Sequence, residues 1–302
     1  MRVQLIHNPA SGTHSETRLD KLTQGFAACG AKVILGETRL DGGTEIRSDC
    51  ELICVSGGDG TLGLVISAMI KSGSQLPVCI YPAGTVNLIA REIGCTSDPE
   101  LFAREVMQGY LSGPESWLHE PVAQTNLGPF VACISAGPDG VAVAKHSPEF
   151  KKRFGKIAYA TSFLKLFFGW PKQTFDIITT SPEGLAERAT CAAFYVAKAR
   201  YFAGSWTLSP DASLGNDGFF LIRLSKATRT SFVRFIAHVA LGKDPAALSF
   251  VDSKFVQSLA IETTGQPETK AAFQVDGDSM EQIPQSVSMT GSIIRYCLPQ
   301  KD

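Results

Sequence analysis

Short apolar runs alternate with helical periodicity from the start of the chain to about residue 115. The runs are compact and mostly β-branched or aliphatic, as parallel strands buried on both faces require, and they occupy residues 3–6, 33–35, 52–55 and 78–81. Apolar residues then recur three and four positions apart, as on one face of a helix, at Leu62, Val65, Ile66, Met69 and Ile70 and at Val86, Ile89, Ala90 and Ile93. Strand, loop and helix in this order predict an open α/β sheet.

From about residue 120 the pattern changes to strand-like runs separated by turns rich in Gly, Pro, Asp and Ser. The predicted strands are residues 130–134, 174–179, 190–197, 219–224, 255–261, 273–275 and 292–296. Two helical segments interrupt them, at 154–168 and 231–241. This half is predicted to be mostly β.

Two domains follow from this change of pattern. We expect an α/β domain over residues 1–118, a β-sandwich domain over residues 119–287, and a tail, 288–302, that returns to the first domain. The pair Gly113-Pro114, within residues 112–117, marks the expected hinge. A chain of 302 residues with 44% hydrophobic and 19% charged residues is long and apolar enough for two buried cores, and it is not of the disordered class.

Charge and cysteine content narrow the classes of function. The formal net charge of -1 gives no overall field that attracts nucleic acid, so no nucleic-acid partner is expected. No apolar stretch reaches the roughly 18 to 20 residues of a spanning helix, and the first residues lack the apolar core of a signal peptide; we expect a soluble cytoplasmic protein. The eight cysteines form no C-x-x-C pair at zinc spacing and are expected to be reduced thiols.

A glycine-rich loop at residues 56–61 carries the strongest chemical signal. Its sequence, Ser-Gly-Gly-Asp-Gly-Thr, directly follows one predicted strand and directly precedes a predicted helix. Glycines let a backbone approach a ligand closely, and the N–H groups at the start of a helix attract an anion. We interpret the loop as a phosphate cradle. An ordinary tight turn is the alternative, but it does not require three glycines around a carboxylate at this edge of a sheet.

Two further loops also follow predicted strands and open helices. In residues 81–87, Thr85 can offer a hydroxyl to a phosphate and Asn87 can cap the helix; residues 8–12 are a weaker element of the same kind. Because neighbouring parallel strands end at one edge of a sheet, we expect these loops to lie beside the first and to form a nucleotide site. Taken alone, the second loop is equally consistent with a turn.

These motifs resemble those of the diacylglycerol kinase catalytic-domain superfamily, which includes diacylglycerol, sphingosine, ceramide and phosphatidylglycerol kinases. The segments NPASG, GGDGT and PAGTVN match its nucleotide-domain motifs in order and spacing, and the likeness continues through ISAGPDGVAVA, FGKIAYA, SPDASLGNDG and VDGD. GGDGT alone also occurs in NAD kinases, but the combination is specific. The resemblance implies an N-terminal nucleotide domain, a C-terminal β-sandwich with the lipid site, and the use of ATP and magnesium.

The resemblance also assigns individual residues. Nucleotide contacts fall on Thr38, Gly57, Gly58, Asp59, Gly60, Thr61, Leu62 and Thr85, and we add Asn87 from the second loop. A magnesium ion would be held by Asp217 and by the backbone carbonyls of Leu214 and Phe219, which would explain why side chains there need not be acidic. Without the resemblance, residues 216–218 would be interpreted as a hairpin turn before the next strand.

Two carboxylates, Asp59 and Asp278, compete for the role of proton acceptor in phosphoryl transfer to a lipid hydroxyl. The family motif at the second position is usually D-G-E, with the glutamate as acceptor, whereas sphingosine kinases often use the cradle aspartate. This chain has D-G-D at residues 276–278. An aspartate is about 1.5 Å shorter, and a displacement of that order can cost about 100-fold in rate. We predict that Asp278 is the base and that Asp59 organises phosphate and metal-bound water; two acids in a hairpin turn are the alternative.

A basic, aromatic segment at residues 150–170 is the candidate membrane contact. It contains seven aromatic residues and five Lys or Arg but no acid, a composition that fits an interfacial helix on anionic headgroups. We predict lipid contact through Phe163, Phe167, Phe168 and Trp170. Alternatively, the aromatic side chains cover the β domain and the lysines are solvated.

The leading hypothesis is an ATP- and Mg²⁺-dependent lipid kinase that transfers the γ-phosphoryl group to a hydroxyl of a diacylglycerol-like lipid, of phosphatidylglycerol, or of a sphingoid base or ceramide. Such a protein would be peripheral to the inner face of the cell membrane, as a monomer or a homodimer. One alternative is a non-catalytic lipid-binding protein with a kinase fold, motivated by the short side chain of Asp278. The other is an NAD-kinase-like nucleotide kinase, which is disfavoured because the β half has no second Gly/Ser-rich NAD signature.

Overall fold

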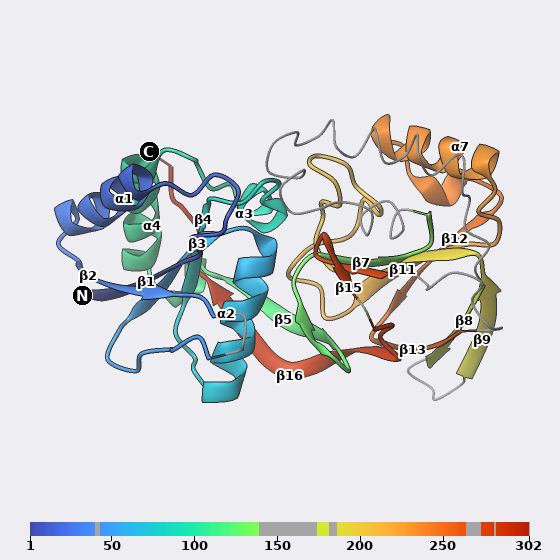
Figure 1. Cartoon of the computed structure of the whole chain (residues 1–302), viewed down its shortest axis with the longest axis horizontal. Helices are drawn as coiled ribbons and strands as arrows, with labels where there is room; N and C mark the ends of the chain where they lie inside the picture. The colour runs from blue at the N-terminus through green and yellow to red at the C-terminus, as the bar shows by residue number, and fades with distance from the viewer. Residues whose placement is uncertain (40–42, 139–173, 181–185, 264–272, 281, 302) are drawn as a thin grey trace. The chain divides into compact units, whose positions relative to one another are not determined.

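The computed structural model describes residues 1–39, 43–138, 174–180, 186–263, 273–280 and 282–301. The chain divides into two compact units (Figure 1). The N-terminal unit consists of Met1–Val122 and Gly291–Asp302, and the C-terminal unit consists of Ala123–Thr290. The division falls within a strand, β5 (Leu118–Thr125), which follows the short 3-10 helix η1 (Pro114–Ser116).

The N-terminal unit is built on a parallel sheet with the strand order β2-β1-β3-β4. The strands are β1 (Arg2–His7), β2 (Lys32–Glu37), β3 (Leu52–Gly57) and β4 (Val78–Pro82), and they coincide with the four apolar runs of the sequence. Every residue of β3 is buried, as a central strand covered on both faces requires. Tyr296, the last residue of β16 (Ser286–Tyr296), pairs in parallel with Val78.

Helices cover both faces of this sheet (Figure 1). On one face, α1 (Glu16–Ala28) and α4 (Pro99–Leu111) pack together, and Phe26 and Phe102 meet edge to face with ring centroids 6.4 Å apart. On the other face lies α2 (Asp59–Ser72), which buries the predicted apolar stripe except for Ile70, which is partly exposed. A short helix, α3 (Leu88–Glu92), follows β4. The open α/β prediction for this half is therefore confirmed.

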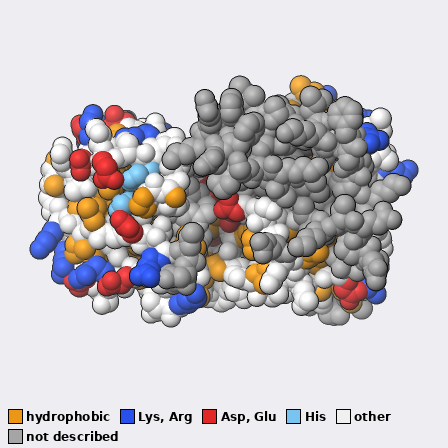
Figure 2. Space-filling model, in the orientation of Figure 1, with side chains coloured by type: hydrophobic (Ala, Val, Ile, Leu, Met, Phe, Trp, Pro, Cys, Tyr) orange, Lys and Arg blue, Asp and Glu red, His pale blue; other side chains and the backbone are white. Residues whose placement is uncertain are grey.

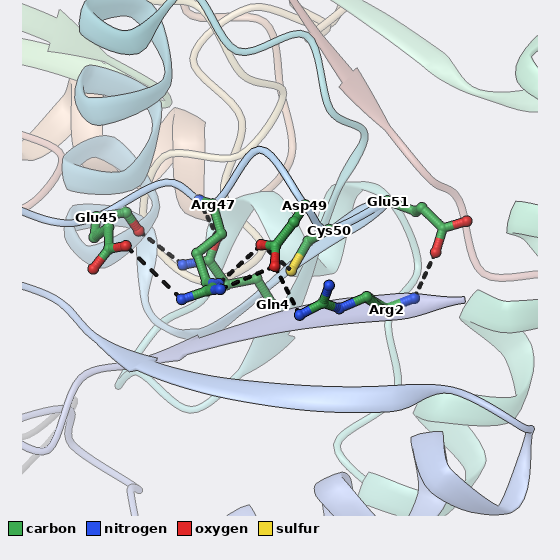
Figure 3. A network of polar contacts seen from close by, with 7 residues as sticks. All are labelled: Arg2, Gln4, Glu45, Arg47, Asp49, Cys50 and Glu51. Atoms are coloured by element: carbon green, nitrogen blue, oxygen red, sulfur yellow. Dashed lines mark hydrogen bonds and ion pairs between the residues drawn. The ribbon is translucent and has the colours of Figure 1, made fainter.

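A polar network holds the connection between β2 and β3 against β1 (Figure 3). The buried amide of Gln4 donates to the carbonyl of Glu45 at 2.8 Å and accepts from the backbone N–H of Arg47 at 2.9 Å. Asp49 then pairs with both Arg47 and Arg2, at 2.9 and 2.7 Å. Exposed ion pairs contribute little individually, so the buried Gln4 contacts fix the position of this connection.

The C-terminal unit is an antiparallel sandwich. One sheet has the order β12-β11-β10-β7-β14-β15; the other is formed here by β16, β13, β8 and β9, with β5 and β6 at its side. The new strands are β6 (Gly128–Phe130), β7 (Cys133–Ala136), β8 (Phe175–Thr180), β9 (Ala186–Cys191), β10 (Ala193–Ala197), β11 (Phe219–Leu224), β12 (Val251–Val256), β13 (Ser258–Thr263), β14 (Phe273–Val275) and β15 (Asp278–Met280). Aromatic side chains from both sheets, including Phe175, Phe194 and Phe273, pack between them. The predicted β-sandwich is confirmed.

Three predicted strands are each two strands in the structure. The runs at 130–134, 190–197 and 255–261 divide into β6 and β7, β9 and β10, and β12 and β13. In each pair the two strands belong to different sheets. The runs stay apolar across the break because both strands contribute side chains to the same core, so hydrophobicity alone does not reveal where the chain passes from one sheet to the other.

The outer face of the first sheet is covered by α7 (Arg229–Ala240), which confirms the packed helix predicted at 231–241. Its first turn is capped by Thr228, whose hydroxyl accepts from the N–H of Ser231 at 3.2 Å. Phe235 is fully buried and its ring stacks on Tyr195 of β10, with centroids 5.2 Å apart. A 3-10 turn, η2 (Pro245–Ala247), leads into β12. The other predicted helix, at 154–168, lies outside the described residues.

Candidate nucleotide and acceptor sites

Three loops come together at one edge of the N-terminal sheet, as the sequence predicts. They follow the adjacent parallel strands β1, β3 and β4. The amide of Asn8 donates to the hydroxyl of Thr61 at 3.0 Å, which joins the first loop to the glycine-rich loop. The N–H of Ala83 donates to the carbonyl of Gly57 at 3.0 Å, and the N–H of Thr13 donates to the carbonyl of Ala83 at 2.9 Å. The loops therefore support one another through direct hydrogen bonds.

The glycines of these loops are required by the close packing of one loop on the next. A Cβ on Gly84 would lie 2.5 Å from the Cα of Gly58, and a Cβ on Gly57 would lie 2.4 Å from the Cβ of Thr61. Distances under 3.0 Å are too short for a side chain to fit without movement of the backbone. Gly58 and Gly84 therefore pack backbone to backbone, whereas Gly57 leaves room for the side chain of Thr61 at the start of α2.

Asp59 acts as a cap that joins the first glycine loop to the second. Its two carboxylate oxygens accept from the backbone N–H groups of Leu88 and Ile89, both at 2.9 Å. The side chain is 7% exposed, and burial raises the pKa of its carboxyl, while the two backbone hydrogen bonds lower it in part. Because both oxygens are engaged at the start of α3, the carboxylate stabilises the arrangement of the two loops.

Asn87 does not cap α3 with its side chain, contrary to the prediction. It occupies the cap position with a left-handed backbone, φ 56°, but its side chain turns back to Gly84. There Oδ1 accepts from the N–H of Gly84 at 2.8 Å and Nδ2 donates to the carbonyl of Gly84 at 2.9 Å. Asp59 takes the capping role because its carboxylate reaches the start of α3 from the first turn of α2.

The remaining predicted nucleotide residues lie around this edge with different exposure. Thr85 is exposed, whereas Thr61 and Leu62 are buried at the start of α2. Thr38 follows β2 directly and its N–H donates to the carbonyl of His7 at 3.0 Å. The first N–H groups of a helix have no partner inside the helix, so Gly60 and Thr61 bring such donors to the edge of the sheet. The geometry suits a phosphate group, and the assignment of individual contacts stays a prediction.

Two histidines at this edge were missed in the sequence. His7 ends β1 and its ring stacks on that of His14, with centroids 5.4 Å apart and planes at 14°. The ring of His7 approaches Glu37 at 3.7 Å, and its Nδ1 is buried without a hydrogen-bond partner among the described residues. Burial lowers the pKa of His7, while Glu37 raises it in part. The sequence feature that could have pointed to this pair is the histidine in MRVQLIHNPA, which directly precedes the first loop.

In the C-terminal unit the D-G-D motif forms the turn between β14 and β15. Asp276 and Gly277 have φ angles of 50° and 85°, as an Asp-Gly pair adopts in a two-residue hairpin. The carboxylate of Asp276 accepts from the backbone N–H groups of Val131, Ala132 and Cys133, at 2.9, 2.8 and 3.0 Å. Asp278 follows as the first residue of β15 and is exposed. The first acid of the motif therefore fixes the turn, and the second presents its side chain at the surface of the unit.

The stretch predicted to hold magnesium has contacts that do not fit a metal ion. The carbonyl oxygen of Leu214 accepts from the amine of Lys198 at 2.6 Å. Asp217 is exposed, and its carboxylate accepts from the amide of Gln257 at 3.4 Å. Phe219 begins β11 at the end of the long connection from β10, which replaces the tight hairpin expected without the resemblance.

The predicted lipid-contact residues Phe163, Phe167, Phe168 and Trp170 lie outside the described residues. Within the described part of the chain, none of the helices combines the length and the hydropathy needed to cross a bilayer. On the visible face of the N-terminal unit, acidic and basic side chains are interspersed (Figure 2). The exposed surface drawn there therefore carries charges of both signs.

Comparison with known proteins gives the same assignment as the motifs. A family model described as the diacylglycerol kinase catalytic domain matches residues 2–113, and one described as the YegS C-terminal NAD kinase beta sandwich-like domain matches residues 132–298. The diacylglycerol kinase of Bacillus subtilis (strain 168) is 26% identical over 249 residues, which cover 80% of this chain and 78% of that protein. That of Staphylococcus carnosus (strain TM300) is 24% identical over 233 residues, with coverage of 75% and 73%.

The fold has a close counterpart among solved structures. The crystal structure of a diacylglycerol kinase from Bacillus anthracis str. Sterne superposes with a TM-score of 0.73 at 21% identity, and the match covers 98% of this chain and 96% of that one. Together, the two family models match most of the sequence in the order of the two units. The chain therefore belongs to the family of proteins that combine a diacylglycerol kinase catalytic domain with a YegS C-terminal NAD kinase beta sandwich-like domain.

Proposed function

We propose that this protein is an ATP- and Mg²⁺-dependent kinase that phosphorylates a hydroxyl group of a membrane lipid of the diacylglycerol, phosphatidylglycerol or sphingoid type. The observation that carries the proposal is the convergence of three loops at one edge of the sheet, next to the start of α2. The carboxylate of Asp59 joins two of these loops by accepting from the N–H groups of Leu88 and Ile89. The names of the relatives, all diacylglycerol kinases, supply the class of acceptor. Magnesium enters with the nucleotide as part of the substrate.

In the proposed reaction, the N–H groups at the start of α2 bind the phosphate chain and the hydroxyl of Thr85 adds a further donor. The lipid oxygen forms a bond to the γ-phosphorus as the bond to the ADP oxygen breaks, and the proton of the lipid hydroxyl passes to the carboxylate of Asp278. Asp278 accepts this proton late in a loose transition state. Asp276 keeps the turn in place while Asp278 acts.

Asp59 is a positioning residue in this proposal. Both of its oxygens accept backbone N–H groups of α3, and its side chain is buried. A general base must come within hydrogen-bond reach of the proton that it accepts, so the exposed Asp278 suits that role better than the buried Asp59. We therefore assign Asp59 to the organisation of the phosphate cradle.

A transfer assay tests the proposal. Purified protein is incubated with labelled ATP, Mg²⁺ and separate micelles of diacylglycerol, phosphatidylglycerol, sphingoid base and ceramide, with NAD in a parallel reaction. We expect transfer to one of the lipids and none to NAD. Transfer to NAD alone would establish a nucleotide kinase, and transfer to none of the acceptors would favour a lipid-binding protein that lacks kinase activity. We also propose that the protein works at the inner face of the cell membrane, from the cytoplasm.

A further inference from the structure

A lysine lies fully buried inside the C-terminal unit. Lys198 directly follows β10 and has 0% of its surface exposed. Its Nζ donates to two backbone carbonyl oxygens, that of Leu214 at 2.6 Å and that of Asn216 at 2.8 Å. Lysine side chains are almost never fully buried unless they are paired, because a buried ammonium loses its hydration. Here the carbonyl dipoles replace part of that hydration.

The two carbonyls belong to a turn that is shaped to present them. The side-chain oxygen of Asn216 accepts from the N–H of Ser213 at 2.6 Å, and the N–H of Asn216 donates to the carbonyl of Ser213 at 3.0 Å. These two bonds close the turn and direct the oxygens of Leu214 and Asn216 toward the lysine. Converging backbone carbonyls are also how proteins hold metal cations, so the turn offers the surroundings of a cation site.

A divalent ion and the lysine would compete for the same oxygen. Magnesium binds oxygen ligands at about 2.0–2.1 Å, so an ion on the carbonyl of Leu214 would lie within a few ångströms of Nζ. Two positive charges at that separation repel strongly where water does not screen them. A carbonyl that accepts a charged N–H donor is also a weaker ligand for a second cation.

We propose that the amine of Lys198 is a built-in cation that takes the place of a metal ion in the turn at residues 213–217. The lysine is fixed at its backbone as well, because its N–H and that of Ala199 both donate to the carbonyl of Ala132, at 2.9 and 3.0 Å. The N–H of Ala132 in turn donates to the carboxylate of Asp276. Lys198 is thus a positioning residue that connects the turn to the D-G-D hairpin, and the C-terminal unit needs no divalent ion for this connection.

Thermal unfolding of the full chain without nucleotide tests the proposal. For the wild-type protein we expect Tm in EDTA and in Mg²⁺ to agree within about 1 °C. Lys198→Ala removes the charge and leaves a space beside two carbonyls, so its Tm should fall by roughly 5 °C or more in EDTA, and Mg²⁺ should restore part of the loss. Lys254→Ala is the matched control, since this exposed lysine pairs with Glu187 on the surface; its Tm should not respond to Mg²⁺.

A wild-type Tm that rises in Mg²⁺ as much as that of Lys198→Ala would overturn the proposal, and so would a Lys198→Ala Tm without any response to Mg²⁺. If Lys198→Ala fails to fold, electron paramagnetic resonance of Mn²⁺ added to the wild type and to Asp217→Asn decides the question. Identical spectra for the two proteins would support the built-in cation. A bound-ion signal in the wild type that Asp217→Asn removes would show a metal at this turn and refute it.

Discussion

Three carboxylates, those of Asp59, Asp276 and Asp278, have different roles, and their surroundings explain the difference. Asp59 and Asp276 are both engaged by backbone N–H groups, two for the first and three for the second. Asp278 stands at the start of an exposed edge strand. Carboxylates that accept several backbone donors hold structure, whereas an exposed one can exchange a proton with a substrate. The motifs GGDGT and VDGD contain all three acids and led us to predict different roles for Asp59 and Asp278, but they do not indicate which backbone N–H groups Asp59 and Asp276 accept.

Asp278→Asn should reduce turnover by at least about 100-fold while nucleotide affinity changes little, because the substitution removes an interaction made in the transition state. Lipid phosphorylation measured against ATP concentration separates the two effects. Asp211→Asn, at an exposed position of the same unit, is the control and should keep wild-type turnover. If Asp278→Asn keeps normal turnover, the proton acceptor lies elsewhere, and Asp59 is the next residue to test.

His7 should make the stability of the protein depend on pH in the range below its ordinary pKa. Burial lowers the pKa of His7 in the folded state, so the unfolded chain binds the proton first as the pH falls below about 6.5. The contribution of neutral His7 to the free energy of unfolding is therefore complete above that pH, and it decreases as the pH falls toward the pKa of His7 in the folded state. Urea unfolding between neutral and mildly acidic pH should show a smaller decrease for His7→Gln than for the wild type. Parallel curves for the two proteins would contradict this account.

At the scale of elements, the loops that open α2 and α3 form one unit because they pack on each other through glycine backbones. Gly84→Ala should separate the two loops and lower nucleotide affinity by about 10-fold or more, since a Cβ there would lie 2.5 Å from Gly58. Isothermal titration with ATP and Mg²⁺ measures the change. Gly63→Ala is the matched control, because nothing lies within 4 Å of a Cβ at that position in α2. Equal affinities for Gly84→Ala and the wild type would show that the packing of these loops does not shape the site.

The sequence predicted a strand or helix correctly where the element buries one face, or both faces, along its whole length. The four parallel strands and α7 have the predicted positions because their apolar patterns are complete within each element. The breaks at residues 131–132, 192 and 257 could not be predicted, since the strands on either side share one core. Contacts between residues far apart in the sequence could not be predicted either. The cap from Asp59 to α3 spans 29 residues, and the bond from Lys198 to Leu214 depends on where a 21-residue connection (residues 198–218) folds back.

At the scale of the whole molecule, the motifs in the sequence were sufficient to predict the family and the type of each unit, because they are spread over both halves.

The membrane contact rests on composition alone and gives a separate prediction. Phe167→Ala and Trp170→Ala should weaken sedimentation with anionic vesicles more than they reduce phosphorylation of a short-chain substrate in solution, because interfacial aromatic residues act only at the bilayer. Phe232→Ala, which removes a buried ring of α7, is a comparison for a purely structural loss. Equal losses in both assays would mean that Phe167 and Trp170 pack in the protein interior.

The last strand of the chain has a consequence for synthesis on the ribosome. The residues directly after β16 complete the first-made unit: Cys297 donates its N–H to the carbonyl of Val78 at 2.8 Å, and the carbonyl of Leu298 lies so close to Gly109 that a Cβ on this glycine would be 1.9 Å away. The edge of β4 in the nascent N-terminal unit therefore stays uncovered while some 170 further residues are translated. Nascent chains of this protein thus expose an open sheet edge throughout the translation of the C-terminal unit, and during that time a chaperone could bind there.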